Sequence, residues 1–203
     1  MTFWDKIAWL YDIAESFNPK SYRNMLEGIK AVVPEGASVL DCAAGTGELS
    51  IAAAEKAEHV FCTDMSLPML ERARKKSAKK GIKNISFGER DIFHLPDGDN
   101  TYDAAIAGNV LHLLEEPEKA VRELCRVTKQ GGRVILPTFM AKSSNPLIKI
   151  YTLLGYRAFA SYTVESYEKM LKSCGVGRVK VTKINGLVPV AFGVIKVYKQ
   201  TER

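Results

Sequence analysis

The feature that most constrains the fold is an alternation of two hydrophobic periodicities between residues 37 and 139. Short strand-like segments alternate there with helix-like segments. The strand-like segments are ASVLDCA (37–43), HVFCTD (59–64), NISFGERD (84–91), YDAAIAG (102–108) and RVILPTF (133–139). The helix-like segments cover about 48–57, 66–80 and 117–129, the last one ending at Gly131–Gly132. This alternation predicts βαβ units with right-handed crossovers around a parallel sheet.

The C-terminal part departs from this alternation. After a helical pattern over about 164–173, the strand-like segments RVKVTKI (178–184) and VAFGVIKVY (190–198) are joined through NGLVP. So short a link predicts an antiparallel pair, because a parallel crossover needs a dozen or more residues. The predicted fold class is α/β: a Rossmann-like doubly wound sheet of about seven strands, mostly parallel with an antiparallel C-terminal hairpin, and helices on both faces. A dinucleotide dehydrogenase instead has two symmetric βαβαβ halves.

The length of 203 residues fits one domain. We expect an N-terminal helical lid at 1–30, a cofactor-binding core at 37–139, and acceptor-side helices with the hairpin at 140–203. Within the first segment an apolar set has helical spacing, which also fits simple packing on the domain; it consists of Phe3, Ile7, Tyr11 and Ala14. Residues 142–162 are also expected to be helical.

Composition excludes several classes of protein. Four scattered cysteines without a CxxC pair argue against a zinc site or a disulfide scaffold and favour a reducing, cytoplasmic setting. No apolar run approaches the ~18 residues of a membrane span. The N-terminal segment has early acids and aromatics, unlike a signal peptide.

Part of the net charge of +6 is concentrated in RARKKSAKKG (72–81). Clustered lysines suit a nucleic acid or an anionic membrane. They equally suit a solvated helix face, where they favour the helix C-terminus ahead of Gly81. No aromatic residue interleaves with them, as a single-strand stacking platform requires.

The segment VLDCAAGTGELS (39–50) is the most informative about function. Asp41 ends the first strand, and a turn of small residues leads into the first helix, at the sheet edge where ligands of open α/β folds bind. The turn has no lysine, which a P-loop requires. Ser50 stands where the dinucleotide fingerprint has Gly or Ala, and Asp41 would repel a pyrophosphate. A cationic ligand group is therefore favoured.

Two further acids follow strands. Asp64 ends the second strand, 23 residues after Asp41, where a carboxylate can accept hydrogen bonds from ribose hydroxyls. In TDMS it could equally cap the following helix. Asp91 ends the third strand and precedes Ile92 and Phe93, so it could bond an adenine amino group while its neighbours hold the ring.

These motifs together resemble class I S-adenosylmethionine-dependent methyltransferases. The form D-x-A-x-GTG, with LPDGDNTYD and AFGVIKVY, resembles the ubiquinone/menaquinone-biosynthesis methyltransferase group. The resemblance implies transfer of a methyl group from S-adenosyl-L-methionine to an acceptor, leaving S-adenosyl-L-homocysteine. The Leu, Ile, Tyr and Phe content of residues 141–162 suggests a small, apolar or aromatic acceptor, although core packing also explains these residues. It implies that the methionine moiety is lined by Asp41, Ala43, Gly45, Thr46, Gly47, Asn109 and Val110. It further implies that the ribose and adenine are held by Asp64, Met65, Asp91 and Ile92.

Methyl transfer from a sulfonium requires mainly orientation and desolvation, so a base is needed only if the acceptor must lose a proton. His112, after the fourth strand, is a candidate base or a packing residue. Tyr11 and Tyr22 could close over the methyl group or form an ordinary aromatic helix face. The candidate catalytic residues are thus His112 and Tyr11; the candidate substrate contacts are Tyr11, Tyr22, Tyr151 and Tyr156.

Two alternatives remain at this point: an NAD(P)-dependent oxidoreductase, and a protein that binds S-adenosylmethionine without catalysis. Ser50 and the C-terminal hairpin argue against the first. We expect a small-molecule acceptor, no nucleic-acid partner, no metal, and a monomer or homodimer, with peripheral membrane contact left open.

Overall fold

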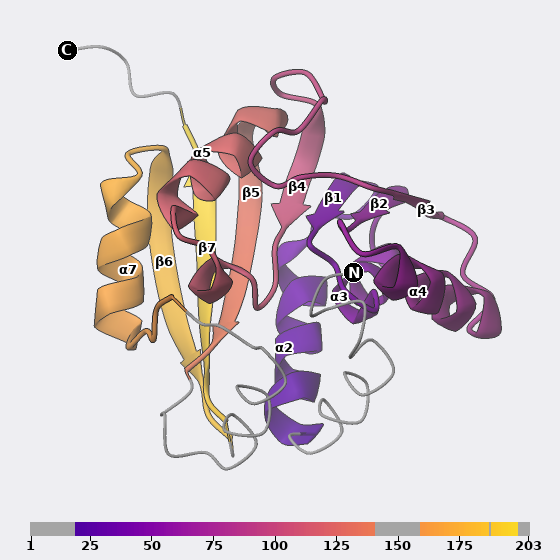
Figure 1. The fold of residues 1–203 in the computed structure, drawn as a ribbon, viewed down its shortest axis with the longest axis horizontal. Helices are drawn as coiled ribbons and strands as arrows, with labels where there is room; N and C mark the ends of the chain where they lie inside the picture. Colours follow the sequence, from indigo (N-terminus) through magenta and orange to yellow (C-terminus); the bar gives the residue numbers. More distant parts are fainter. Residues whose placement is uncertain (1–18, 141–158, 187, 199–203) are drawn as a thin grey trace.

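A seven-stranded sheet forms the centre of the computed structural model, which describes residues 19–140, 159–186 and 188–198 (Figure 1). The strands are β1 (Ser38–Cys42), β2 (His59–Thr63), β3 (Ile85–Gly88), β4 (Tyr102–Ile106), β5 (Thr128–Phe139), β6 (Gly177–Ile184) and β7 (Val190–Val197). Their order is β3-β2-β1-β4-β5-β7-β6, with β7 antiparallel to both of its neighbours and the other pairs parallel. This confirms the predicted fold class, including the hairpin.

Helices cover both faces of the sheet. They are α2 (Pro19–Val32), α3 (Glu48–Ala54), α4 (Leu67–Lys79), α5 (Pro117–Val127) and α7 (Val164–Ser173), with the short 3-10 helix η1 (Leu111–Leu113) after β4. Because neighbouring strand residues point to opposite faces, Val39 packs in the layer of α2 and α3, and Leu40 in the layer of α5 and α7. The strand order reverses direction between β1 and β4, and this topological switch point lies near the middle of the sheet.

The boundary between α5 and β5 differs from the prediction. The helix ends at Val127, and Thr128 already pairs with Tyr102 of β4. The register then shifts before Ala104 pairs with Arg133. A Cβ on Gly132 would lie 2.7 Å from the Asp103 carbonyl oxygen and 2.8 Å from that of Lys129. Gly131 and Gly132 therefore belong to the irregular first part of β5 and do not end α5.

The N-terminal lid remains a prediction. Phe3, Ile7, Tyr11 and Ala14 lie outside the described residues, as does most of the expected helix at 142–162. The described part of the 1–30 segment is α2, whose Met25 and Ile29 are fully buried against the sheet. In the ranges that the structure describes, no helix is long and apolar enough to cross a membrane.

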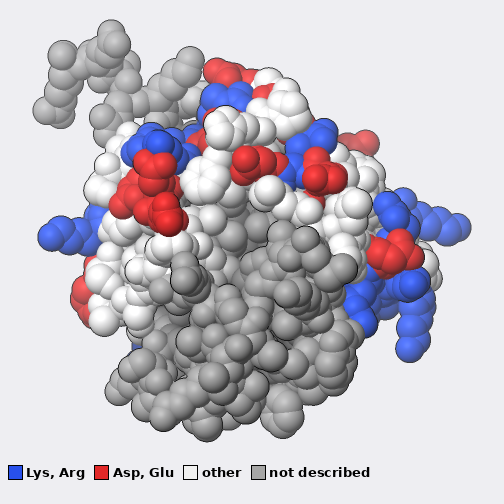
Figure 2. Space-filling model, viewed as in Figure 1, with Lys and Arg blue, Asp and Glu red and all other residues white. Residues whose placement is uncertain are grey.

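The basic segment lies on α4 at one end of the sheet. Figure 2 shows lysine and arginine side chains gathered at the edge where Figure 1 places this helix. The inward face of α4 packs through Leu70 and Ala73 against Cys62. Ser66 caps the helix by accepting a hydrogen bond from the Met69 N–H at 3.4 Å.

Candidate active site

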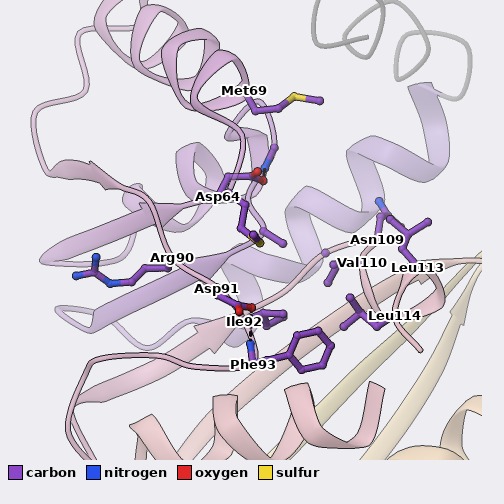
Figure 3. A pocket seen from close by; sticks show the side chains of 14 residues that line it. Asp64, Met69, Arg90, Asp91, Ile92, Phe93, Asn109, Val110, Leu113 and Leu114 are labelled. Atoms are coloured by element: carbon purple, nitrogen blue, oxygen red, sulfur yellow. Dashed lines mark hydrogen bonds between the residues drawn. The ribbon is translucent and has the colours of Figure 1, made fainter. Parts of the chain in front are cut away.

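A cavity of about 410 Å³ lies at the carboxyl ends of the parallel strands (Figure 3). It is lined by Ala43, Gly45, Asp64, Met65, Met69, Arg90, Asp91, Ile92, Phe93, Gly108, Asn109, Val110, Leu113 and Leu114. A smaller cavity of about 30 Å³ beside it shares four of these residues and reaches Tyr22 and Met25 of α2. The larger cavity therefore combines an apolar lining with a few carboxylates and exposed backbone, as ligand sites commonly do.

The turn after β1 forms one wall of both cavities. Ala43, Gly45 and Gly47 adopt φ values of 55°, 55° and 82°. This left-handed conformation is costly for a residue with a side chain, so the strain at Ala43 is held by the surrounding structure. The Ala44 N–H donates to the Thr63 carbonyl at 2.9 Å, which ties the turn to the end of β2.

Asp64 joins the turns that follow β1 and β2. Its Oδ2 accepts a hydrogen bond from the Gly45 N–H at 2.8 Å, and its Oδ1 accepts one from the Ser66 N–H at 2.8 Å. The cap of α4 is Ser66, so the alternative interpretation of Asp64 as this helix cap is wrong. Each carboxylate oxygen has a further lone pair. Asp64 can therefore hold the loop and accept hydrogen bonds from a ligand in the cavity (Figure 3).

Asp91 lines the cavity three residues after the end of β3 at Gly88, so the predicted strand over 84–91 was too long at its end. Its Oδ1 accepts a hydrogen bond from the Phe93 N–H at 2.9 Å, and its Oδ2 lies 3.3 Å from Nδ1 of His94. Ile92 and Phe93 provide apolar surface on this side, and Leu114 lines the cavity as well (Figure 3). A carboxylate beside apolar walls suits a flat ring that carries an amino group.

Asn109 fixes the backbone between β4 and β5. It has a φ of 54°, a conformation that Asn tolerates better than most residues. Its N–H donates to the Pro137 carbonyl at 2.8 Å, and its Oδ1 accepts from the Phe139 N–H at 2.9 Å. Asn109 therefore sets the shape of the wall that the two cavities share.

Asp41 lies beneath the turn and is fully buried. Its Oδ2 accepts a hydrogen bond from Ser50 Oγ at 2.6 Å, while its Oδ1 has no hydrogen-bond partner among the described residues. Burial raises the pKa of Asp41 to about 7, against the lowering effect of the Ser50 hydrogen bond. Among the described residues no cation pairs with this carboxyl group, which is only partly ionised at neutral pH.

His112 lies partly buried on η1. Its Nδ1 lies 3.0 Å from Oγ1 of the buried Thr138, and its carbonyl accepts hydrogen bonds from Phe159 and Ala160 at 2.9 and 3.2 Å. Burial lowers the pKa of the His112 imidazole to about 4. It is therefore neutral at pH 7 and only a weak base.

Comparison with known proteins identifies the family of the chain. Residues 34–179 match the family described as a methyltransferase domain. The chain belongs to this family.

Relatives of this methyltransferase domain agree with the resemblance found in the sequence. The chain is 34% identical over 152 residues to the demethylmenaquinone methyltransferase of Renibacterium salmoninarum, covering 73% of this chain and 62% of that protein. It spans about three-fifths of the length of the curated relatives that it matches.

Two solved structures share the fold of the methyltransferase domain. A SAM-dependent methyltransferase from Aquifex aeolicus is 26% identical, with a TM-score of 0.62 and coverage of 80% of this chain and 84% of that one. A putative S-adenosyl-L-methionine-dependent methyltransferase from Methanococcus maripaludis has a TM-score of 0.77 at 21% identity, covering 100% and 97%.

The structure places the sequence-derived site residues in three groups. Most of the candidate cofactor residues line the cavity: Ala43, Gly45, Asp64, Met65, Asp91, Ile92, Asn109 and Val110. Asp41, Thr46 and Gly47 are buried and do not line this cavity. Tyr22 lines the smaller cavity, whereas Tyr11, Tyr151 and Tyr156 lie outside the described residues.

Three features of the methyltransferase domain escaped the sequence analysis. Met69 lines the cavity one helical turn after Met65, a spacing that could have indicated it. Leu113 and Leu114, which follow the candidate base His112 in the sequence, also line the cavity. Lys76 of α4 donates to Thr46 Oγ1 at 2.8 Å and pairs with Glu48 at 2.9 Å, which fastens the turn from outside. No local pattern indicates a contact across 30 residues.

We expect the His112 imidazole to stay neutral at every pH above about 5, because its burial disfavours the charged form. An NMR pH titration of the histidine side chains measures this, with His112→Asn assigning the signal. An imidazole that titrates between pH 6 and 7, at about the unperturbed pKa, would contradict the burial argument and restore His112 as a candidate general base.

We expect Gly47→Ala to lower the free energy of unfolding by about 2–5 kcal/mol. The new Cβ would lie 2.7 Å from Ala73 Cβ and 3.3 Å from Ala73 Cα, at a φ of 82°. Gly36→Ala is the matched control, since Gly36 has a φ of 68° with nothing within 4 Å of a Cβ. Urea unfolding of both variants separates the steric cost from the backbone cost, and equal losses would contradict tight packing at Gly47.

Proposed function

We propose that this methyltransferase domain transfers the methyl group of S-adenosylmethionine to a small, apolar or aromatic acceptor, with quinone precursors as the first class to test. The observation that carries the proposal is the cavity at the carboxyl edge of the sheet. It brings Gly45, Asp64 and Asp91 together with an apolar lining. The printed name of a relative, demethylmenaquinone methyltransferase, supports the acceptor class.

The residues of the site fit this cofactor. Asp64 offers carboxylate oxygens for ribose hydroxyls, and Asp91 lies beside the apolar surface that an adenine needs. In its ionised form, Asp41 with its unpaired Oδ1 makes the region behind the turn negative, which favours a cationic ligand over a phosphate. The smaller cavity shares the walls Ala43, Gly45, Gly108 and Asn109, so the methionine end could extend toward α2.

Bound S-adenosylmethionine would supply an electrophilic methyl group on a sulfonium. The work of the chain is to hold donor and acceptor in line and to exclude water from the reacting atoms. The turn after β1 and Asn109 line the smaller cavity together with Tyr22 and Met25 of α2. We assign His112 a positioning role, because it connects η1, the end of β5 and the chain at Phe159.

Calorimetry with S-adenosylhomocysteine tests the cofactor, and a screen for transfer of a tritiated methyl group to quinols, catechols, thiols and amines tests catalysis. We expect binding in the first experiment and transfer to quinols in the second. Binding without transfer would favour the non-catalytic alternative. A titration with NADH is the control for the oxidoreductase alternative, which the family assignment does not favour.

A further inference from the structure

The net charge of the protein is located in one segment. Residues 67–83 contain seven lysines and arginines and one acid, Glu71, so the segment has a net charge of +6, equal to that of the whole chain. The basic residues are Arg72, Arg74, Lys75, Lys76, Lys79, Lys80 and Lys83. The remainder of the chain has equal numbers of basic and acidic residues. The resulting field is therefore strongly one-sided, and it is centred on α4 at the sheet edge (Figure 2).

Most of these basic side chains face solvent. The buried side of α4 consists of Met69, Leu70, Ala73 and Ser77. Lys76 turns inward to Thr46 and Glu48 and belongs to the loop contacts described above. Arg74 and Lys75 form exposed pairs with Glu71, at 3.1 and 3.4 Å. Lys80 also pairs with Glu48, at 3.6 Å. Exposed pairs contribute little and two acids cannot neutralise seven basic residues, so an excess of positive charge remains.

The same helix begins with exposed apolar residues. Met65 and Leu67 have exposed fractions of 63% and 62%, unusually high for large apolar side chains. Met65 also lines the larger cavity and so forms part of its rim, whereas Leu67 lies just outside that lining. Leu67 lies one and two turns before Glu71 and Arg74, and thus on the same outward stripe. Apolar rim and basic face therefore form one continuous surface.

We propose that residues 65–83 dock this protein on an anionic lipid surface. The basic residues would contact lipid phosphates, and Met65 and Leu67 would enter the interfacial region, the arrangement by which amphipathic surfaces bind membranes. The exposed apolar residues here are aliphatic. The aromatic rings nearby, Phe87 and Phe61, are covered by Arg74 and Arg90 at 5.2 and 5.0 Å. A nucleic-acid strand would find no stacking platform on the described part of this face.

Docking in this orientation would place the cavity rim at the lipid. An apolar acceptor partitions into a bilayer, so it could reach the cavity without crossing water. This consequence rests on the proposed function, whereas the docking itself does not.

Sedimentation with phosphatidylcholine vesicles, with and without phosphatidylglycerol, tests the proposal on the full chain. We expect binding only when phosphatidylglycerol is present, and weaker binding as salt is raised. The triple variant Lys75→Gln, Lys79→Gln, Lys83→Gln should bind about 100-fold more weakly, from about tenfold per 1.4 kcal/mol and about 1 kcal/mol for each charge. Leu67→Gln should bind about tenfold more weakly with the same salt dependence.

The matched control is Lys169→Gln, Arg178→Gln, Lys180→Gln, which makes the same change in net charge on exposed residues of α7 and β6 at the other end of the sheet (Figure 1). It should change vesicle affinity by less than about threefold, because the charges lie beyond the Debye length of about 10 Å from the docked face. Equal losses in both triple variants, no binding to anionic vesicles, or binding to double-stranded RNA in place of vesicles would each overturn the proposal. Affinity for S-adenosylhomocysteine without vesicles reports on the proposed function separately and should be unchanged in all three variants.

Discussion

Replacing Asp64 with alanine is expected to lower the affinity for S-adenosylhomocysteine by at least about 100-fold. The variant loses the acceptor for the Gly45 and Ser66 N–H groups, both at 2.8 Å, so the turns after β1 and β2 are no longer joined. Each lost hydrogen bond to a charged group costs about 1.5–3 kcal/mol. The cavity also loses the carboxylate proposed to accept hydrogen bonds from the ribose. Calorimetry measures the combined effect.

Asp103→Ala is the matched control for this experiment. Asp103 also accepts a hydrogen bond from a backbone N–H, that of Ser38 at 3.0 Å, and pairs with Lys129. It lies at the amino end of β4, opposite the edge that holds the cavity. We expect a comparable loss of stability and no change in S-adenosylhomocysteine affinity. Unchanged affinity in Asp64→Ala would contradict the cofactor site itself, and equal losses in both variants would show that the effect is one of folding.

The positions of Asp64 and Asp91 could be predicted because they follow directly from the fold. In a parallel sheet the carboxyl ends of neighbouring strands meet at one edge, so acids placed there by the hydrophobic pattern must lie near each other. The antiparallel hairpin was predictable for a similar reason, since the link between its strands is too short for a crossover. Both inferences use only chain length and strand direction.

The features that escaped prediction depend on contacts between distant residues. The helical pattern continues to about residue 129, but Thr128 instead pairs with Tyr102, and its Oγ1 donates to the Leu124 carbonyl at 2.7 Å. Ser50 argued against a dinucleotide in the sequence, yet its local role is to donate to Asp41. The burial of Asp41 follows from how α3 covers β1, which no short motif specifies.

Asp41→Asn is expected to remove the loss of stability that the wild type suffers as pH rises toward 8. The folded-state pKa of Asp41 is about 7, against an ordinary value of 3.8 in the unfolded chain. Between these values the folded state holds the proton and the unfolded state does not, so the free energy of unfolding falls as pH rises through this window. The loss is at most about 4 kcal/mol, from 1.36 kcal/mol per pKa unit. Asparagine does not titrate in this range. The free energy of unfolding of Asp41→Asn, minus that of the wild type, should therefore increase between pH 4.5 and pH 8.

Ser50→Ala should act in the opposite direction. The Ser50 hydrogen bond favours the ionised carboxylate, so its removal raises the Asp41 pKa further and makes the variant lose more stability at pH 8 than at pH 4.5. Urea unfolding of the three proteins at both pH values measures these differences, and parallel curves would contradict a titrating Asp41. If the buried charge is retained for a cationic ligand, S-adenosylhomocysteine binding near pH 7 should release a proton from the wild type and none from Asp41→Asn. Calorimetry in buffers of different ionisation enthalpy detects that proton directly, and it would show that the stability lost to the Asp41 charge is regained on binding.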